Sequence, residues 1–538
     1  MIPRFPRVTL LPRDPRVNLD FAAPKNQDVR WGGMLMRRAA GIAIVTALVI
    51  ACSPAPPMTQ QLAQEAAAAM GGADRLRAIK TLAMKGGVGT RLRLGQTVHA
   101  TDTETPATLK NVVETVDLAN GRAQLDYELQ LGAFGQHRKE TLTKKNGRAV
   151  GLEDVAGRPL AIMSPSGLFS WGTQNNPEVL LRRNIITVMS AALMSPTSDA
   201  PSDRQLDGKT YKYGTATLAN GERVGLYFDP QSKLLSAYET TDTETMLGDL
   251  PAQYLLADYR DINGVKLPHT ITIRKGSQPY SDVRFSSASI DDPADDSLFA
   301  IPDSANAEVD RAIQAGDYSP IAISKIGDGV YFARAYSHNS MIVEFPAWLA
   351  VVEAAYTDAQ SATLVRALNE QFPGKPIRYA IVTHHHFDHT GGVRGLAAAG
   401  ATILVEKGHE PLLRRIVESP HTNPPDALET ARKSGKAGAL EIYEGKKVLS
   451  DGKQLLELYP ITGNPHVDPK VIVYAPSARA LFQSDLFIPG VGAPAGPEAA
   501  HLLKSVQDLK LRVDRNVGGH GGVAPFAELV KAVAATGR

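Results

Sequence analysis

Besides His385, three imidazoles and one carboxylate lie within six residues of one another in the segment 383–392 (THHHFDHTGG). His384 and His386 are two positions apart, so in an extended segment both side chains point the same way and can face one metal ion. His385 would then point elsewhere, and we expect it to make a structural hydrogen bond. Neutral imidazole nitrogen and carboxylate oxygen together suit a borderline metal such as zinc.

The surroundings of this run predict a buried site rather than a surface histidine cluster. Residues 378–383 (RYAIVT) are nearly continuous in apolar residues, which is typical of a strand buried on both faces. Where that strand ends, Asp388 and His389 can turn toward a neighbouring point. Gly391 and Gly392 then permit a tight entry into the next helix. The strand before the run and the glycines after it argue against a chance cluster of exposed histidines.

HxHxDH in this context is the defining motif of the metallo-β-lactamase superfamily, and residues 322–538 resemble that superfamily throughout. Three further contexts match in order: GNPH at 463–466, LFQSD at 481–485 and GHG at 519–521. A glycine is usual before the acid of the second context. Ser484 replaces it here, a small change that we expect to be tolerated. The resemblance implies that His384, His386 and His466 bind one metal ion, that Asp388, His389 and His520 bind a second, and that Asp485 bridges the two.

The same resemblance implies an αββα sandwich for residues 320–538, within an overall α/β fold class. The pattern along the chain agrees with it. Strands are predicted at 329–335, 341–345 and 349–353, a helix at about 358–372, and further βα units after it. In such layered α/β folds the chemistry is expected at the C-terminal ends of the strands.

Two divalent ions about 3.5–4 Å apart can share a water molecule, lower its pKa toward about 7 and polarise the substrate oxygen. The sequence therefore predicts a dinuclear zinc hydrolase in which a hydroxide that bridges the metals attacks a small ester, lactone, thioester, amide or phosphoester. Iron or manganese are the alternative metals. Asp388 would be the catalytic residue, because it can orient the hydroxide and later pass a proton to the leaving group.

Two other functions stay open at this point. One is an iron-dependent redox member of the superfamily, although diiron reductases typically have Glu at the position of His386. The other is a non-enzymatic envelope lipoprotein that carries or senses a hydrophobic ligand. Specificity would lie in loops such as 335–340 and 408–446. The remaining histidines lack ligand-like spacing, although two of them, at 409 and 421, lie on segments that could border the site: His99, His137, His269, His338, His409, His421 and His501.

Residues 34–52 have the features of a bacterial lipoprotein signal peptide. Two arginines precede an uncharged apolar run at 39–51, which is shorter than the roughly 20 residues that cross a bilayer core. The run ends in VIAC, which resembles the lipobox, and Cys52 is the single cysteine of the chain. We therefore predict lipidation at Cys52 and a membrane anchor. Ser53 after the cysteine suggests, by resemblance to lipoprotein sorting rules, the outer membrane with the protein facing the periplasm.

Residues 1–33 are rich in Arg and Pro and do not fit a signal peptide, so we assign them no fold. Translation from Met34 or Met36 would remove them, and an extended leader is the alternative.

Residues 58–310 are predicted to form a β-rich domain. Helices are expected at 59–72 and 73–79, and alternating runs separated by Asn-Gly turns follow. The stretch 257–274 resembles periplasmic lipoprotein-carrier and sensor domains, which are half-open barrels around a hydrophobic cavity. A structural spacer is the alternative interpretation. A linker is expected near 302–320.

The chain of 538 residues is too long for one hydrophobic core, which agrees with two folded domains. Its 58 basic and 56 acidic side chains give a formal charge of +2, so it has no basic field for binding nucleic acid. Neither composition nor motif indicates an oligomeric state.

Overall fold

The structure is a computed structural model, and the described part of the chain lies within one compact unit. Both predicted N-terminal segments, 1–33 and 34–52, lie outside the described residues, and so does the predicted lipidation site at Cys52. Among the described residues, no helix combines the length and the apolar character that a membrane span needs. The description covers residues 58–537 except 133, 156–160, 164–176, 196, 198, 245, 277, 294, 316–319, 336–337, 355 and 493.

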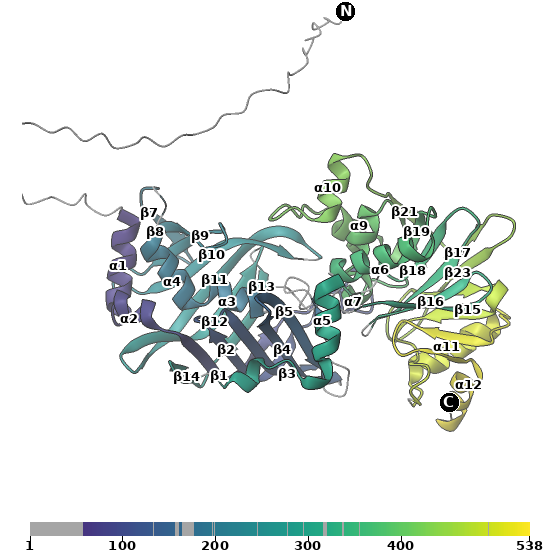
Figure 1. Cartoon of the computed structure of the whole chain (residues 1–538), viewed down its shortest axis with the longest axis horizontal. Helices are drawn as coiled ribbons and strands as arrows, with labels where there is room; N and C mark the ends of the chain where they lie inside the picture. Colours follow the sequence, from purple (N-terminus) through teal and green to yellow (C-terminus); the bar gives the residue numbers. More distant parts are fainter. Residues whose placement is uncertain are drawn as a thin grey trace, which may run out of the picture. The chain divides into compact units, whose positions relative to one another are not determined.

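The N-terminal domain begins with helices α1 (Met58–Met70) and α2 (Ala73–Ala78) and continues as one antiparallel sheet (Figure 1). The strand order is β6-β5-β4-β3-β2-β1-β13-β12-β11-β10-β9-β8-β7, and β14 also pairs with β1. The strands are β1 (Thr81–Arg91), β2 (Ala107–Asp117), β3 (Arg122–Leu131), β4 (Phe134–Lys145), β5 (Arg148–Val155), β6 (Ala161–Met163), β7 (Ser202–Leu206), β8 (Lys209–Thr217), β9 (Arg223–Phe228), β10 (Leu235–Glu244), β11 (Gly248–Ile262), β12 (Val265–Lys275), β13 (Gln278–Arg284) and β14 (Ser287–Ile290).

Asn-Gly pairs close several of these hairpins, as the sequence predicts. Asn146 and Gly147 connect β4 to β5 with φ values of 51° and 76°, and Asn263 and Gly264 connect β11 to β12 with 50° and 81°. A positive φ at both central residues matches the twist of the paired strands, and Asn and Gly adopt it at low cost.

Two helices cover one face of the sheet and complete its core. The helix α3 (Pro177–Arg183) packs against β2–β4, and α4 (Ile185–Met194) packs against β8 and α1. Asn184 caps α4 by accepting a hydrogen bond from the backbone of Thr187 at 3.0 Å. Most of α4 is buried, so it is a core helix rather than an amphipathic surface helix.

Part of the predicted linker is a helix, which corrects the interpretation of residues 302–320. The helix α5 (Asn306–Ala315) buries Val309 and Ala312 against Val150 and Leu152 of β5. The helix has few apolar residues, and they stand among acidic and polar ones, so its composition resembles that of a linker. The spacing of those apolar residues is nevertheless helical.

The C-terminal domain consists of two sheets with helices on both outer sides, the αββα sandwich that the sequence predicts (Figure 1). The first sheet has the order β15 (Ala322–Gly327), β16 (Val330–Arg334), β17 (Ser340–Glu344), β18 (Leu349–Val352), β19 (Ile377–Ile381), β20 (Thr402–Glu406) and β21 (Leu440–Tyr443). The second has the order β22 (Lys447–Ser450), β23 (Leu455–Ile461), β24 (Lys470–Ala475), β25 (Ala480–Gln483), β26 (Arg515–Gly518) and β27 (Val523–Pro525).

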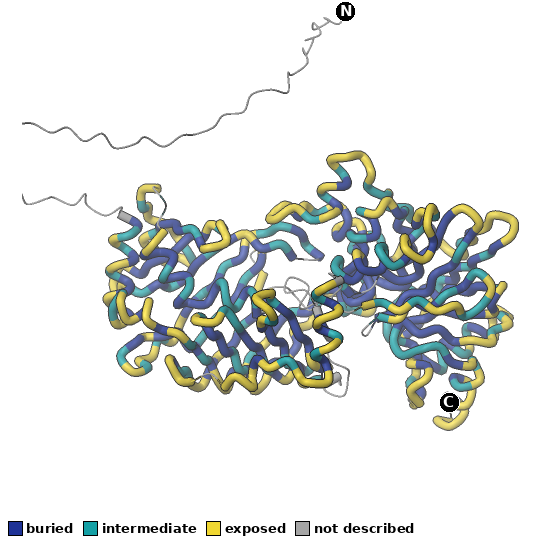
Figure 2. The backbone as a smooth tube through the Cα atoms, viewed as in Figure 1, coloured by how far each residue is buried: buried dark blue, intermediate teal, exposed yellow. Residues whose placement is uncertain are grey.

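Alternation along the strands builds three layers of core in this domain. Met341 and Val343 of β17 pack into the cluster between the sheets, whereas Ile342 packs into the cluster under the first layer of helices. Figure 2 shows strands of both sheets buried along much of their length. The helices of that layer are α6 (Asp358–Gln371), α8 (Val393–Ala398), α9 (Glu410–Glu418) and α10 (Ala427–Lys433), and those of the opposite layer are α11 (Pro497–Asp508) and α12 (Ala527–Ala535).

Candidate metal centre

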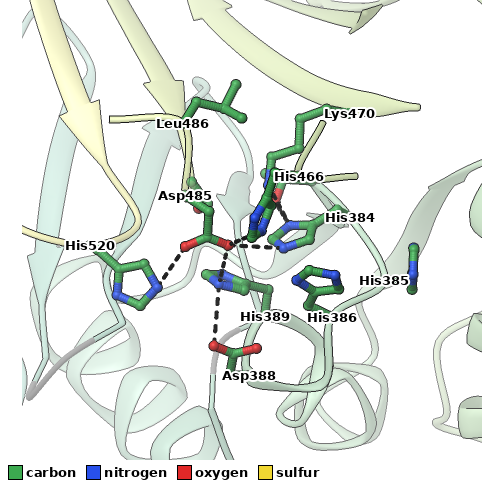
Figure 3. Close-up of polar contacts among 12 residues, drawn as sticks. His384, His385, His386, Asp388, His389, His466, Lys470, Asp485, Leu486 and His520 are labelled. Atoms are coloured by element: carbon green, nitrogen blue, oxygen red, sulfur yellow. Dashed lines mark hydrogen bonds and ion pairs between the residues drawn. The ribbon is translucent and has the colours of Figure 1, made fainter. Parts of the chain in front are cut away.

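The seven predicted ligands come together beyond the C-terminal ends of β19 and β25 (Figure 3). The run at 384–386 follows β19, and the short helix α7 (Phe387–Thr390) turns the next two ligands toward the same place. The ligand atoms form two groups, and within each group they lie within 4.8 Å of one another. One group is His384, His386, His466 and Asp485; the other is His338, Asp388, His389 and His520.

Asp485 connects the two groups. Its Oδ2 lies 3.0 Å from Nε2 of His384 in the first group and 2.8 Å from Nε2 of His389 in the second. Its Oδ1 lies 2.8 Å from Nε2 of His520, also in the second group. Asp485 lies two residues after the end of β25 and has a φ of 65°, a conformation that a non-glycine residue adopts only when its surroundings hold it. The structure therefore places this carboxylate between the groups, where a bridging ligand would lie.

Three of the histidines are held by an outer hydrogen bond that determines which ring nitrogen faces the centre. Nε2 of His386 lies 3.0 Å from the carbonyl oxygen of Thr97 and can donate its hydrogen there, which leaves the Nδ1 lone pair free. Nδ1 of His389 contacts a carboxylate oxygen of Glu353, which leaves Nε2 free. Such outer partners orient metal-binding histidines and fix their tautomer.

His384 is oriented in the same way by its neighbour. Thr383 Oγ1 lies 3.0 Å from Nδ1 of His384 and donates its own hydrogen to Glu353 at 2.6 Å. Nδ1 of His384 therefore faces Thr383, and Nε2 points toward Asp485. The buried amine of Lys470 lies 2.7 Å from the same Nδ1, and burial lowers the pKa of Lys470 to about 8.

Glu353 is a member of this site that the sequence analysis missed. It lies just after β18, is fully buried, and accepts hydrogen bonds from Thr383 and from Ser484 Oγ at 3.1 Å as well as contacting His389. Ser484, which replaces the usual glycine, thus gains a partner. Gly519 makes room for it, because a Cβ there would lie 1.9 Å from Ser484 Oγ. No pattern around Glu353 signals this role, since all its contacts are with sequence-distant residues.

His338 is the second residue that the sequence analysis missed, because it was grouped with the histidines that lack ligand-like spacing. It is buried, and its Nε2 lies 3.1 Å from Oδ2 of Asp388. Its ring stacks on Tyr356 with centroids 4.6 Å apart and lies 4.3 Å from the ring of His520. His338 stands alone in the loop before β17, and tertiary structure rather than spacing brings it to the site.

His385 lies outside both groups and points away from Asp485 (Figure 3). Its Nε2 lies 2.9 Å from the carbonyl oxygen of Thr97, and its Nδ1 lies 3.1 Å from Nδ1 of His409. Burial lowers the pKa of His385 to about 4, so the ring is neutral and serves in hydrogen bonding.

The charges around the centre suit a cation. Burial favours the neutral form of Asp485, but the imidazoles of His389, His520 and His466 outweigh it and hold the pKa of this carboxyl well below its usual value. Burial keeps the pKa of His384 well below its usual value, so its imidazole is neutral. Nε2 of His384 and Nε2 of His389 both point at Oδ2 of Asp485, at 3.0 and 2.8 Å. Converging carboxylates and imidazole nitrogens are the donor set that a divalent metal ion needs, so the residues present fit such an ion.

A segment of the N-terminal domain also borders this centre. Between β1 and β2, the side chain of Gln96 donates a hydrogen bond to Oδ1 of Asp388 at 3.1 Å. The carbonyl of Gly95 accepts from the backbone of Phe387 at 3.1 Å, and that of Val98 accepts from Asp468 at 2.9 Å. With the contacts of the Thr97 carbonyl, these bonds make residues 95–98 part of the wall of the metal centre.

The comparisons with known proteins agree with this geometry. Residues 336–520 match the family model described as the metallo-β-lactamase superfamily. The α/β domain with its paired groups of ligands is therefore a domain of that superfamily, as the motif predicts.

Two curated proteins resemble parts of the chain. The α subunit of 2,4-dinitroanisole O-demethylase from Nocardioides sp. is 25% identical over 167 residues, which are 31% of this chain and 44% of that protein. The alkyl/aryl-sulfatase BDS1 of Saccharomyces cerevisiae is 34% identical over 73 residues, which are 13% of this chain and 11% of that protein. The chain thus spans less than half of the length of these relatives.

Among solved structures, a metallo-β-lactamase from Hirschia baltica is similar to this chain, with 21% identity and a TM-score of 0.31. The match covers 40% of this chain and 98% of that protein.

Proposed function

We propose that the chain is a zinc-dependent hydrolase that holds two metal ions in its C-terminal domain and cleaves a small ester, lactone, thioester, amide or phosphoester. The position of Asp485 carries this proposal, because one carboxylate contacts imidazole nitrogens of both ligand groups. A pair of divalent ions that share such a carboxylate supplies, when bound, an activated water and a Lewis acid for the substrate oxygen.

Neighbouring side chains would hold two residues of the centre, Asp388 and His389, in place during the reaction. Gln96 and His338 hold the two oxygens of Asp388, so its carboxylate keeps one orientation. Burial opposes ionisation of Asp388, but His389 and His338 outweigh it and hold the pKa of Asp388 well below its usual value. The ionised carboxylate can take up a proton during attack and deliver it to the leaving group. Glu353 keeps His389 in place through the reaction.

The names of the two curated relatives guide the choice of substrates. One is an O-demethylase of 2,4-dinitroanisole and the other is an alkyl/aryl-sulfatase. We therefore include an aryl methyl ether and an aryl sulfate beside carboxylic esters, lactones, thioesters, amides and phosphodiesters.

The test combines metal analysis with turnover on this panel. Purified protein should contain close to two zinc ions per chain, and chelation should abolish a turnover that added zinc restores. Protein that binds zinc but turns over no member of the panel, or that binds no metal, would contradict the hydrolase and favour the carrier or sensor. Restoration by iron alone, together with oxygen consumption, would favour the redox alternative. His386 argues against that alternative, because the structure brings it into the first ligand group.

We also propose that a lipid at Cys52 anchors the chain to the bacterial outer membrane, facing the periplasm. The support is the signal-peptide pattern of residues 34–52, with the single cysteine at the cleavage position. Substrates would then be small molecules that reach the periplasm.

A further inference from the structure

The N-terminal domain contains an apolar cavity, and none of the predicted metal ligands lines it. It has about 70 Å³ of space for the centres of water-sized molecules, and about 810 Å³ of unfilled space in all, part of it open to solvent. Several times the volume that one water needs is thus available. Its walls come from α3 and from the neighbouring central strands β2, β1, β13, β12, β11 and β10 of the sheet, and they include Leu82, Val116, Val179, Leu256, Ile273 and Phe285.

Most polar side chains along this wall already have partners. Arg183 pairs with Glu222 at 2.7 Å and with Asp242. The hydroxyl of Tyr254 accepts a hydrogen bond from Arg183 at 3.1 Å, and that of Tyr238 donates to the Arg183 carbonyl at 2.7 Å. These two tyrosines also stack on each other, with centroids 4.5 Å apart. Their polar atoms are therefore engaged within the protein.

Glu114 differs from these residues. It lies on β2 opposite Met84 of β1, and its side chain lines the cavity. Within the part of the chain that the structure describes, no hydrogen bond or ion pair is found for its carboxyl group. Burial raises the pKa of Glu114 to about 7, although the positive charge of Arg91 opposes this shift. The Glu114 side chain is half-buried, so its unpaired carboxyl group is within reach of a ligand that occupies the cavity.

We propose that this cavity binds a small amphiphile with an apolar body and a protonated amine, and that the ammonium group pairs with the carboxylate of Glu114. The apolar wall would take up the body of the ligand. Each methylene that leaves water contributes about a fourfold gain in affinity. The head group would supply the donor that Glu114 lacks. This proposal does not depend on the hydrolase, since none of the lining residues is a predicted metal ligand.

The experiment compares three probes that share one alkyl chain and differ in head group. Octylamine, octan-1-ol and octanoic acid are titrated into the full chain at pH 8 by calorimetry, where the amine is protonated and Glu114 is mostly ionised. Octylamine should bind at least tenfold more tightly than octanoic acid, whose charge Glu114 would repel. Hexylamine, with two methylenes fewer, should bind about 16-fold more weakly than octylamine.

Two variants test the role of the carboxyl group. Glu114→Gln keeps the side-chain volume, so octylamine should bind at least tenfold more weakly while octan-1-ol changes less than threefold. Glu128→Gln on the neighbouring strand β3 is the matched control, because Glu128 is exposed, and it should leave octylamine binding unchanged.

A third variant separates the cavity from the metal centre, since an amine can also bind a metal ion. Ile271 lines the cavity, and Ile271→Trp should abolish octylamine binding by filling it. Circular dichroism melting checks that each variant is folded. The proposal is overturned if octanoic acid binds as tightly as octylamine, if Glu114→Gln leaves octylamine affinity unchanged, or if none of the probes binds.

Discussion

Replacing Gln96 by alanine tests whether the N-terminal domain contributes to metal binding. The substitution removes the amide that donates to Oδ1 of Asp388 at 3.1 Å and leaves the predicted ligands themselves intact. Asp388 would lose one of the two partners that orient its carboxylate, the other being His338. The ion predicted to bind Asp388, His389 and His520 should therefore bind more weakly, and the ion of the other group should be little affected.

The expected size of the effect follows from the type of hydrogen bond. A hydrogen bond to a charged group contributes about 1.5–3 kcal/mol, which corresponds to a factor of about 10–150 in an equilibrium constant. Loss of an outer partner of a metal ligand typically costs about 10–100-fold in metal affinity. Because Gln96 is half-buried and water can replace part of its bond, we expect the lower end, about tenfold.

The assay is competition for zinc between the protein and a chelating dye, which resolves a tight and a weak ion. Gln278→Ala is the matched control, because Gln278 lies exposed on β13 of the same domain. Two zinc ions that bind Gln96→Ala as tightly as the wild type would refute the argument. Equal weakening of both ions would also refute it, because it would indicate a general disturbance rather than the loss of one oriented carboxylate.

Three further predictions concern the centre, the core and the anchor. Asp485→Asn keeps the side-chain volume but removes the charge between the ligand groups. The second ion should therefore be lost and turnover should fall at least about 100-fold, which corresponds to about 2.7 kcal/mol of barrier. His385→Asn should keep two ions and most activity, and metal content and kcat are measured for both variants. Met189 of α4 is fully buried, so Met189→Ala should lower the free energy of unfolding by about 2–5 kcal/mol in denaturant titrations. A loss below about 1 kcal/mol would mean that neighbouring side chains fill the space and leave no cavity. Cys52→Ala should release the protein from membranes, and wild type that washes off in buffer without an acyl group would count against the anchor.

The sequence predicts the candidate ligands better than their supports, for a physical reason. His384 and His386 carry a signal because they share one strand end, where a period of two puts both on one side. Asp485 lies two residues after a short, largely apolar strand, in a context that the superfamily shares. Glu353 and His338 have no such local signal, since their roles depend on contacts with residues that fold back from elsewhere. Sequence periodicity describes single elements, whereas these two side chains depend on how elements meet.

The same reasoning explains which parts of the fold were missed. Strands and longer helices of the sandwich follow from their apolar patterns. No clear pattern in the sequence indicates the helix α10 or the strand β21, because both are short and lie in a polar stretch between stronger signals. The helix α5 was interpreted as a linker because its few apolar residues stand among acidic ones. Each of these elements is stabilised by the surface it packs on, which a single-sequence pattern does not contain.

Contacts from both domains converge on Asp388. From one side, Gln96 of the N-terminal domain donates to its Oδ1. From the other side, His338 contacts its Oδ2 and stacks on Tyr356, whose hydroxyl donates at 2.5 Å to Glu153 on β5 of the N-terminal domain. A domain that served only as a spacer would not need to place polar groups on both sides of a predicted metal ligand. Together with the Thr97 carbonyl at His386, these contacts tie the orientation of two predicted metal ligands to the position of the N-terminal domain.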